Sequence, residues 1–265
     1  MKPAPFAYAR PKDWPDALRL LAAGARPGAG TQSLGPLLNL RLAQPDTIAD
    51  LRHLPDYAGV ALAGDAIRIG AGTTHAAIED GVVPGRLGEI MAAVARRIAY
   101  RPVRNRGTIG GSLAHADPAA DWVAVLPALG ATAIALGPKG ERRIPTAGFV
   151  TGIFETALAA DELLRAIELP ALPAGARWGH WKFCRKVGEF SKATACVLAL
   201  PGQTPRAVLA ALDAPPLVIE DARALMADPV AEAARLLDGF PDLTAWRRAI
   251  AATALRHAVA QASAA

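Results

Sequence analysis

Residues 104–121 read RNRGTIGGSLAHADPAAD, and this stretch determines how the rest of the chain is interpreted. Within it, residues 107–112 contain three glycines and two hydroxyl side chains. Glycine lets a ligand approach the backbone closely, and hydroxyl groups donate to anionic oxygens. The segment is therefore a candidate phosphate-binding loop, with an ordinary structural turn as the alternative.

A second glycine-bearing loop lies upstream, where residues 26–34 read RPGAGTQSL. Gly28 and Gly30 keep bulky side chains away from the backbone, so its N–H groups are expected to form an anion cradle. Taken alone, this loop is weaker evidence than the first, because an ordinary turn explains it equally well.

Three motifs together point to a family. The two loops, followed by RKVGEF at residues 185–190, closely resemble motifs of the FAD-binding medium subunits of molybdenum hydroxylases. The type is that of the carbon monoxide dehydrogenase flavoprotein and of the xanthine dehydrogenase FAD subunit. Their common order over residues 26–190 argues against a chance similarity.

The resemblance implies an α+β fold of the vanillyl-alcohol oxidase and p-cresol methylhydroxylase type. An FAD-binding domain would span residues 1–170, with the cofactor between subdomains of about 1–55 and 56–170. Residues 171–265 would form a small α+β C-terminal domain of the carbon monoxide dehydrogenase flavoprotein type. The Pro/Gly/Ala-rich stretch 170–175 is the expected linker.

The resemblance also assigns roles to individual residues. The two loops would hold the FAD pyrophosphate, Asp121 would accept hydrogen bonds from the adenosine ribose hydroxyls, and Leu163 or its neighbour would line the adenine side. Lys186 would lie near the isoalloxazine, where a cation stabilises the reduced, anionic flavin. The predicted cofactor-binding residues are Ala29, Gly30, Thr31, Gln32, Ser33, Leu34, Gly107, Thr108, Ile109, Gly110, Gly111, Ser112, Asp121, Leu163 and Lys186.

Several of these residues also have a purely structural interpretation. Asp121 could cap the helix that follows it, and Lys186 could be a solvated charge on a strand. Phe190 is expected to pack in the core rather than stack on the flavin. His115 with Asp117 and Asp121 is only a weak candidate for metal ligation, so no metal site is predicted.

The chain departs from the family pattern at identifiable places. Thr31 stands where the family usually has glycine, which adds a side chain beside the phosphates. Glu189 replaces an aspartate, and Phe190 replaces a common tyrosine. The segment after Cys196 is short and alanine-rich for the family's tail domain.

Composition excludes several classes of protein. The 265 residues contain only two cysteines and no CxxC pair, which argues against iron–sulfur ligation, structural zinc and disulfides within this chain. The net charge of +5 is spread too thinly for a nucleic-acid groove. No stretch approaches the ~20 apolar residues of a membrane span, and a cytoplasmic location is expected.

The resemblance implies two partner subunits. A large subunit would bind the molybdenum cofactor and the organic substrate, and a small one would carry two 2Fe-2S clusters, in a dimer of heterotrimers. Electrons would pass from a cluster through FAD to an external acceptor, so no catalytic residue is predicted in this chain. The organic substrate stays open, as does the choice of NAD, a quinone or another carrier as acceptor.

Two other functions remain compatible with the sequence. The chain could be a stand-alone FAD-dependent reductase or oxidase of the same fold, which would need an acid or base over the flavin ring. Alternatively, it could be a flavin-less scaffold that has kept the fold, for which the departures at Thr31 and in the tail are the only support.

Hydrophobic periodicity and turn residues predict the secondary structure. Helices are expected over residues 13–23, 35–40, 73–79, 87–99, 121–129, 230–237 and 242–259. Strands are expected over residues 47–51, 60–62, 66–69, 131–136, 142–144, 163–169, 178–184 and 193–200. The pair 60–62 and 66–69 forms a predicted hairpin around Gly64, and the pair 131–136 and 142–144 flanks a predicted turn at residues 137–140.

Overall fold

The structure, a computed structural model, describes residues 2–264 and contains helices and strands in the mixture predicted for an α+β protein. The helices are α1 (Trp14–Ala22), α2 (Leu34–Asn39), α3 (His75–Glu79), α4 (Gly85–Ala95), α5 (Arg101–Arg104), α6 (Ile109–His115), α7 (Asp121–Ala128), α8 (Arg223–Ala227), α9 (Pro229–Leu237) and α10 (Ala245–Ala264), with short 3-10 turns η1 (Leu51–His53) and η2 (Thr146–Gly148). The strands are β1 (Ala7–Ala9), β2 (Arg26–Gly28), β3 (Thr47–Asp50), β4 (Val60–Ala63), β5 (Ala66–Gly70), β6 (Thr132–Gly137), β7 (Gly140–Pro145), β8 (Val150–Gly152), β9 (Glu155–Thr156), β10 (Leu163–Pro170), β11 (Arg177–Phe183), β12 (Ala193–Ala199), β13 (Arg206–Ala210) and β14 (Leu217–Ile219).

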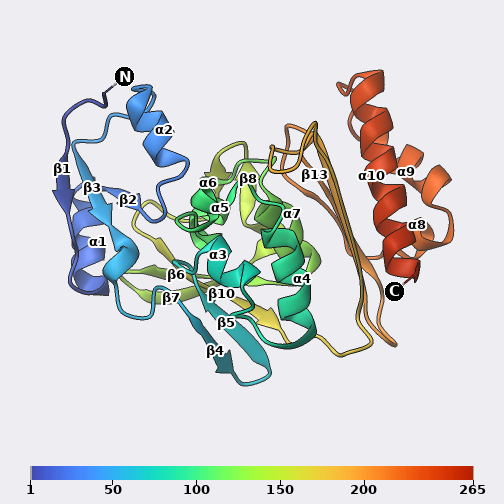
Figure 1. Ribbon diagram of the computed structural model, residues 1–265, viewed down its shortest axis with the longest axis horizontal. Helices are drawn as coiled ribbons and strands as arrows, with labels where there is room; N and C mark the ends of the chain where they lie inside the picture. The colour runs from blue at the N-terminus through green and yellow to red at the C-terminus, as the bar shows by residue number, and fades with distance from the viewer. Residues whose placement is uncertain (1, 265) are drawn as a thin grey trace.

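The N-terminal unit is a parallel sheet of order β1-β3-β2 with α1 packed against it (Figure 1). Helix α1 begins where the Asp13 carboxylate accepts a hydrogen bond from the Asp16 N–H at 2.8 Å. It ends before Gly24, whose φ of +85° turns the chain away. Both ends were predicted from the sequence, and the helix buries Trp14 and Ala17.

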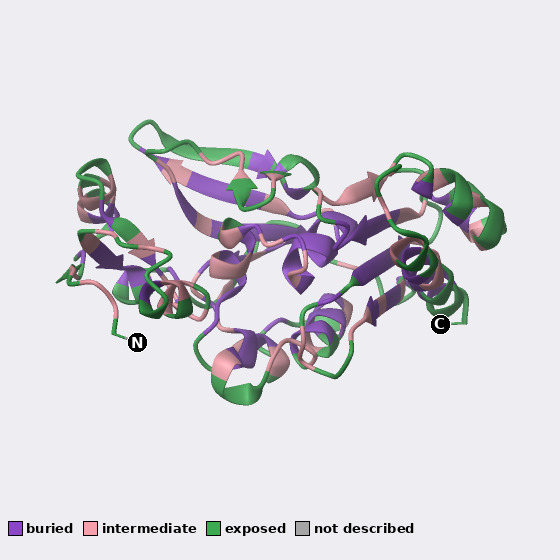
Figure 2. Cartoon of the chain, turned by 90° about the horizontal axis from the view of Figure 1, so that it is seen from above, coloured by how far each residue is buried: buried purple, intermediate pink, exposed green. Residues whose placement is uncertain are grey.

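The central unit is an antiparallel sheet of order β4-β5-β10-β6-β7. The hairpins β4–β5 and β6–β7 were predicted from their glycine turns, and β10 joins them by pairing with both β5 and β6. The largest fully buried side chains of the molecule include Trp122 and Phe149 of this unit. Figure 2 shows the buried residues concentrated in the middle of the molecule.

The C-terminal unit is an antiparallel sheet, β11-β12-β13-β14, between α10 on its outer face and α7 on its inner face (Figure 1). Side chains alternate between the faces of a strand. In β11, Trp181 stacks on His257 of α10, whereas Lys182 reaches Asp121 of α7. The sheet thus carries a row of side chains toward the central unit.

The structure corrects some of the local predictions. Residues 109–112, expected as part of a loop, form the start of helix α6, because the Thr108 hydroxyl accepts the Gly111 N–H and caps the helix. Helix α4 ends at Ala95 rather than at residue 99. The elements missed were mostly short, namely β1, β2, β8, β9, β13, β14, α5 and α8.

Gly179 marks the closest approach between the C-terminal sheet and its helix. A Cβ atom there would lie 1.8 Å from the Ala258 carbonyl oxygen, whereas a Cβ on Gly148 would meet nothing within 4 Å. We therefore expect Gly179→Ala to push α10 off β11 and to lower the free energy of unfolding by about 1–3 kcal/mol. Thermal unfolding checks this, with exposed Gly148→Ala as the control; equal melting temperatures for the two variants would contradict the packing.

Candidate functional site

A cavity of about 570 Å³ lies where the three units meet. The 26–34 loop lines it from the N-terminal unit, the 107–112 segment from the central unit, and β11 with the loop after it from the C-terminal unit. Of the predicted site residues, those lining the cavity are Ala29, Gly30, Thr31, Gln32, Ser33, Leu34, Gly107, Thr108, Gly110, Gly111, Ser112, Asp121 and Leu163. Ile109, which is fully buried in the core, and Lys186 are not among the lining residues.

The two glycine loops touch each other across the boundary between units. A Cβ atom on Gly30 would lie 2.0 Å from the Arg106 carbonyl oxygen, so only glycine permits this contact. Segments about 80 residues apart in the chain thereby form one continuous wall of the cavity.

The first loop presents free backbone N–H groups to the cavity. Within residues 2–264, the N–H groups of residues 30–33 have no hydrogen-bond acceptor. A run of such groups is an anion-binding concavity. Thr31 has a φ of +57°, so the loop keeps the left-handed backbone that glycine favours, at a cost of about 1–2 kcal/mol for a residue with a Cβ.

The second loop differs from the prediction, because most of its N–H groups are already used. Five of the six in residues 107–112 donate within the protein: Gly107 to Val103, Ile109 to Thr73, Gly110 to Ala71, and both Gly111 and Ser112 to Thr108. The expectation of an N–H-rich cradle is therefore wrong for this segment. The motif could not reveal this, since each of these acceptors is set by how the segment folds.

The glycines of the second loop serve close packing instead. A Cβ on Gly110 would lie 2.3 Å from the Ala71 Cβ, and one on Gly107 would lie 2.9 Å from Cδ2 of His75. The segment therefore packs directly on the residues that follow β5, and it lines the cavity on its other side.

Asp121 and Lys182 form a buried ion pair at the boundary with the C-terminal unit. Lys182 Nζ lies 2.8 Å from Asp121 Oδ2, and both side chains line the cavity. Asp121 Oδ1 is buried without a hydrogen-bond partner in the described chain. Burial raises the pKa of Asp121, and the Lys182 ammonium opposes that rise. Asp121 does not cap α7, whose cap residue is Ala120.

Sequence reasoning missed Lys182. It is the only lysine in the expected strand 178–184, and alternation places it on the same face as Trp178 and His180. That pattern was the available signal, but pairing it with Asp121 needed the three-dimensional arrangement.

The RKVGEF motif lies at the cavity mouth, in the loop between β11 and β12. Gly188 forms a β-bridge with Ile98 and lines the cavity together with Glu189 and Phe190. The expectation that Phe190 packs in the core is wrong, because its side chain is 63% exposed. Lys186 is exposed on a loop rather than on a strand, 3.8 Å from the Glu189 carboxylate.

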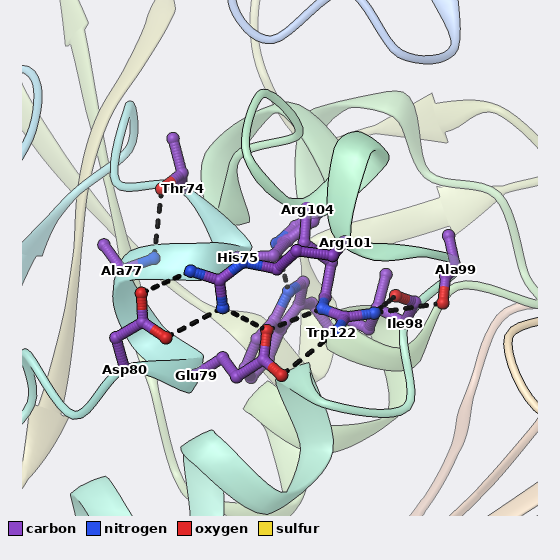
Figure 3. Close-up of polar contacts among 10 residues, drawn as sticks. All are labelled: Thr74, His75, Ala77, Glu79, Asp80, Ile98, Ala99, Arg101, Arg104 and Trp122. Atoms are coloured by element: carbon purple, nitrogen blue, oxygen red, sulfur yellow. Dashed lines mark hydrogen bonds and ion pairs between the residues drawn. The ribbon is translucent and has the colours of Figure 1, made fainter.

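An arginine clamp fixes residues 98–99, the segment that pairs with Gly188 (Figure 3). Arg104 donates to both carboxylate oxygens of Glu79, at 2.7 and 3.1 Å, and to the carbonyls of Ile98 and Ala99 at 2.9 and 3.0 Å. Arg101 adds a hydrogen bond of 2.8 Å to Glu79. A rigid planar guanidinium suits such multiple bonding. The clamp holds the segment at residues 98–99, which lines the cavity, in one conformation.

The remaining walls combine apolar and hydroxyl-accepting surface. Leu158, Leu163 and Leu164 line one part of the cavity, and the unpartnered Asp121 oxygen lies at another. The arrangement offers an anion cradle, an acceptor for a hydroxyl group and an apolar surface for a ring. These are the chemical features that a dinucleotide requires.

Residues 2–264 contain neither a metal-binding cluster nor a helix that could span a membrane. No group of three or more His, Cys, Asp or Glu side chains there is arranged to hold a metal ion, and His115 does not form one with Asp117 and Asp121. No helix in that range is both long and apolar enough to cross a membrane.

Comparisons with known proteins agree with this geometry. Residues 4–172 match the family model described as the FAD binding domain in molybdopterin dehydrogenase. The chain is 38% identical over 200 residues to the nicotine 6-hydroxylase medium subunit of Paenarthrobacter nicotinovorans, covering 75% of this chain and 70% of that protein. It is also 38% identical over 202 residues to the carbon monoxide dehydrogenase medium chain of Afipia carboxidovorans, with the same coverage.

Similarity in three dimensions extends over the whole chain. A chain of the carbon monoxide dehydrogenase from Hydrogenophaga pseudoflava superimposes with a TM-score of 0.89 at 30% identity. The match covers 100% of this chain and 99% of that one. It therefore includes the C-terminal sheet and helices.

Gly30 provides a test of the contact between loops. We expect Gly30→Ala to separate the loops and to destabilise the protein by about 1–3 kcal/mol, because its Cβ would collide with the Arg106 carbonyl. Gly35→Ala is the matched control: it lies in α2 with nothing within 4 Å of its Cβ and should be neutral or stabilising by up to about 1 kcal/mol. Urea denaturation gives the free energy of unfolding of both variants. A Gly30→Ala protein as stable as the parent would contradict the contact.

The buried ion pair gives a pH-dependent prediction. Lys182→Met leaves Asp121 as an unpaired buried carboxylate, which should cost about 3–5 kcal/mol near neutral pH. Burial would then raise the pKa of Asp121 with the Lys182 charge gone and the charge of Arg97 still opposing the rise, so the folded protein binds a proton more tightly than the unfolded chain. The loss should therefore shrink as pH falls from 8 to 5. Denaturation at pH 8 and pH 5 measures the loss of stability at each pH, and Lys186→Met, at an exposed lysine, serves as the control. A loss that is equal at both pH values would refute it.

Proposed function

The chain belongs to the family of FAD-binding medium subunits of molybdenum hydroxylases, and from this membership we propose that it binds FAD in the cavity between its three units. As a component of such oxidoreductases, it passes electrons through the flavin to an external acceptor. The observation that carries the site assignment is the run of unpartnered N–H groups at residues 30–33, which face a cavity of about 570 Å³.

In this proposal, FAD supplies the redox chemistry, and the chain binds and orients it. The N–H groups of residues 30–33 bind the pyrophosphate, while 107–112 forms the floor against which it lies. Asp121 Oδ1 accepts a hydrogen bond from an adenosine ribose hydroxyl, which its lack of a protein partner supports. Leu163 lines the adenine side.

The cation near the isoalloxazine has two candidates. Lys186 keeps the role that the resemblance gave it, on a loop whose neighbours Gly188 and Phe190 line the cavity mouth. Lys182 is a second candidate, because its ammonium lies inside the cavity wall. A positive charge beside the flavin would stabilise the reduced, anionic form.

We further propose the domain organisation that the sequence suggested, with an FAD-binding domain at 1–170, divided near residue 55, and a C-terminal domain at 171–265. Separate sheets in the three parts support this division. The boundary at 170 also falls at the end of β10, where a loop without regular structure begins.

The partners follow from the medium-subunit family. Relatives are named medium subunit or medium chain, which denotes complexes that also contain small and large subunits. We propose a small subunit with two 2Fe-2S clusters as electron donor, a large subunit with the molybdenum cofactor, and a cytoplasmic dimer of heterotrimers.

An absorbance titration of the purified chain tests cofactor binding. We expect flavin bands to remain with the protein after added FAD is removed by gel filtration, at one FAD per chain. Gly30→Ala should lose most of this binding, because it disturbs the cradle, and Gly35→Ala should retain it. A parent protein that stays colourless would overturn the assignment and favour a flavin-less scaffold.

Co-expression with genes adjacent to its own tests the electron-transfer role. We expect a larger complex to form. In this complex, a substrate of the large subunit should reduce the flavin, so that the flavin absorbance bands fade. Substrate-driven flavin reduction by the isolated chain would instead identify a stand-alone reductase or oxidase.

A further inference from the structure

A buried histidine, His75, lies beside Gly107 of the second loop. His75 is the first residue of α3, where the Thr74 hydroxyl caps the helix by accepting the Ala77 N–H. Its own N–H donates to the Gly107 carbonyl at 2.9 Å. This bond holds the start of α3 against the second loop, and the His75 side chain is 95% buried in the cavity wall.

The hydrogen bond from Trp122 determines which nitrogen of His75 carries the proton. The indole Nε1–H donates to His75 Nδ1 at 3.1 Å, as Figure 3 shows. Because an indole nitrogen can only donate, Nδ1 must be unprotonated. Burial, together with the positive charge of Arg104, lowers the pKa of His75 to about 4, so the ring is neutral near pH 7 and carries its proton on Nε2.

The resulting Nε2–H group lies against the cavity without an acceptor. A Cβ placed on Gly107 would be 3.0 Å from Nε2, so this nitrogen lies beside Gly107, on the side where a side chain would project. Among residues 2–264 no atom accepts a hydrogen bond from it. Nε2 is not among the fully buried side-chain atoms that lack a partner, so it keeps access to the cavity and can donate to a ligand acceptor there.

The His75 donor matters because the N–H groups of the second loop are mostly used within the protein. Since five of its six N–H groups already donate within the protein, the loop has little left to offer an anion passing over Gly107. The first loop supplies free N–H groups, and His75 Nε2–H adds a donor beside Gly107.

We propose that His75 is a cofactor-binding residue whose Nε2–H donates a hydrogen bond to a pyrophosphate oxygen of FAD beside Gly107. Trp122 is a positioning residue, because its indole fixes the tautomer that presents this proton. The inference rests on the proposed binding of FAD in this cavity. It assigns to the pyrophosphate an uncharged side-chain donor in addition to the N–H groups of residues 30–33.

Two substitutions separate the two nitrogens of the ring. The amide of Asn reaches about as far as Nδ1, and that of Gln about as far as Nε2. His75→Asn therefore keeps an acceptor for Trp122 but loses the donor to the cavity, whereas His75→Gln keeps a donor toward the cavity. Calorimetry on the full chain, with FAD as the titrant, measures the affinity of each.

We expect His75→Asn to bind FAD about 10- to 100-fold more weakly than the parent, the loss typical of one hydrogen bond to a charged group. His75→Gln should retain most of the affinity. Riboflavin, which has no phosphate, should bind the parent and both variants equally. A His75→Asn protein that folds and binds FAD as tightly as the parent would overturn the proposal.

A measurement on the parent keeps the proposal testable even if the variants fold poorly. In ¹⁵N-histidine-labelled protein, His75 should show a protonated Nε2 and an unprotonated Nδ1 near pH 7, and the Nε2 signal should shift on addition of FAD but not of riboflavin. A proton on Nδ1, or an Nε2 signal that FAD leaves unchanged, would refute the assignment. If the parent binds no FAD at all, the proposed function itself falls, which is a distinct result.

Discussion

The contact between Gly30 and the Arg106 carbonyl is the constraint on which the rest of the site depends. It joins the parallel N-terminal sheet to the antiparallel central sheet at a point where no side chain fits. Next to this contact, residues 30–33 line the cavity, and their N–H groups have no acceptor within the described chain. If the two loops were further apart, the N–H groups of residues 30–33 would be exposed to bulk water.

The two glycine loops are similar in sequence, but their backbone N–H groups have different roles. The first has unpartnered N–H groups and can bind an anion. The second uses its N–H groups to dock on the residues after β5 and to begin helix α6, so its glycines allow close packing. Polar side chains from elsewhere, Asp121 and His75, then supply hydrogen-bonding groups that this loop cannot.

Much of the fold was predictable from the sequence because its signals are local. Asp13 and Gly24 mark the ends of α1, and the turns at Gly64 and Gly140 mark the two hairpins of the central sheet. Short strands such as β13 and β14 were missed, since three to five residues show too little periodicity without their sheet. Helix α6 was missed because a glycine-rich run is a poor helix former until packing and a cap stabilise it.

The candidate site was predicted less completely, for a physical reason. Loop residues carry their own signal, but Lys182 and His75 acquire their environment only when a strand and a helix from different units close on the cavity. Phe190 was expected in the core on its apolar character, yet the Gly188–Ile98 bridge holds its loop at the mouth, where it stays exposed.

The position of bound FAD decides whether the cavity is the cofactor site, and a crystal structure of the chain grown with FAD would show it. We expect the pyrophosphate within hydrogen-bond distance of the N–H groups of residues 30–33, with the rest of the dinucleotide filling the cavity between the three units. FAD bound elsewhere, or a pyrophosphate that makes no contact with residues 30–33, would contradict this expectation.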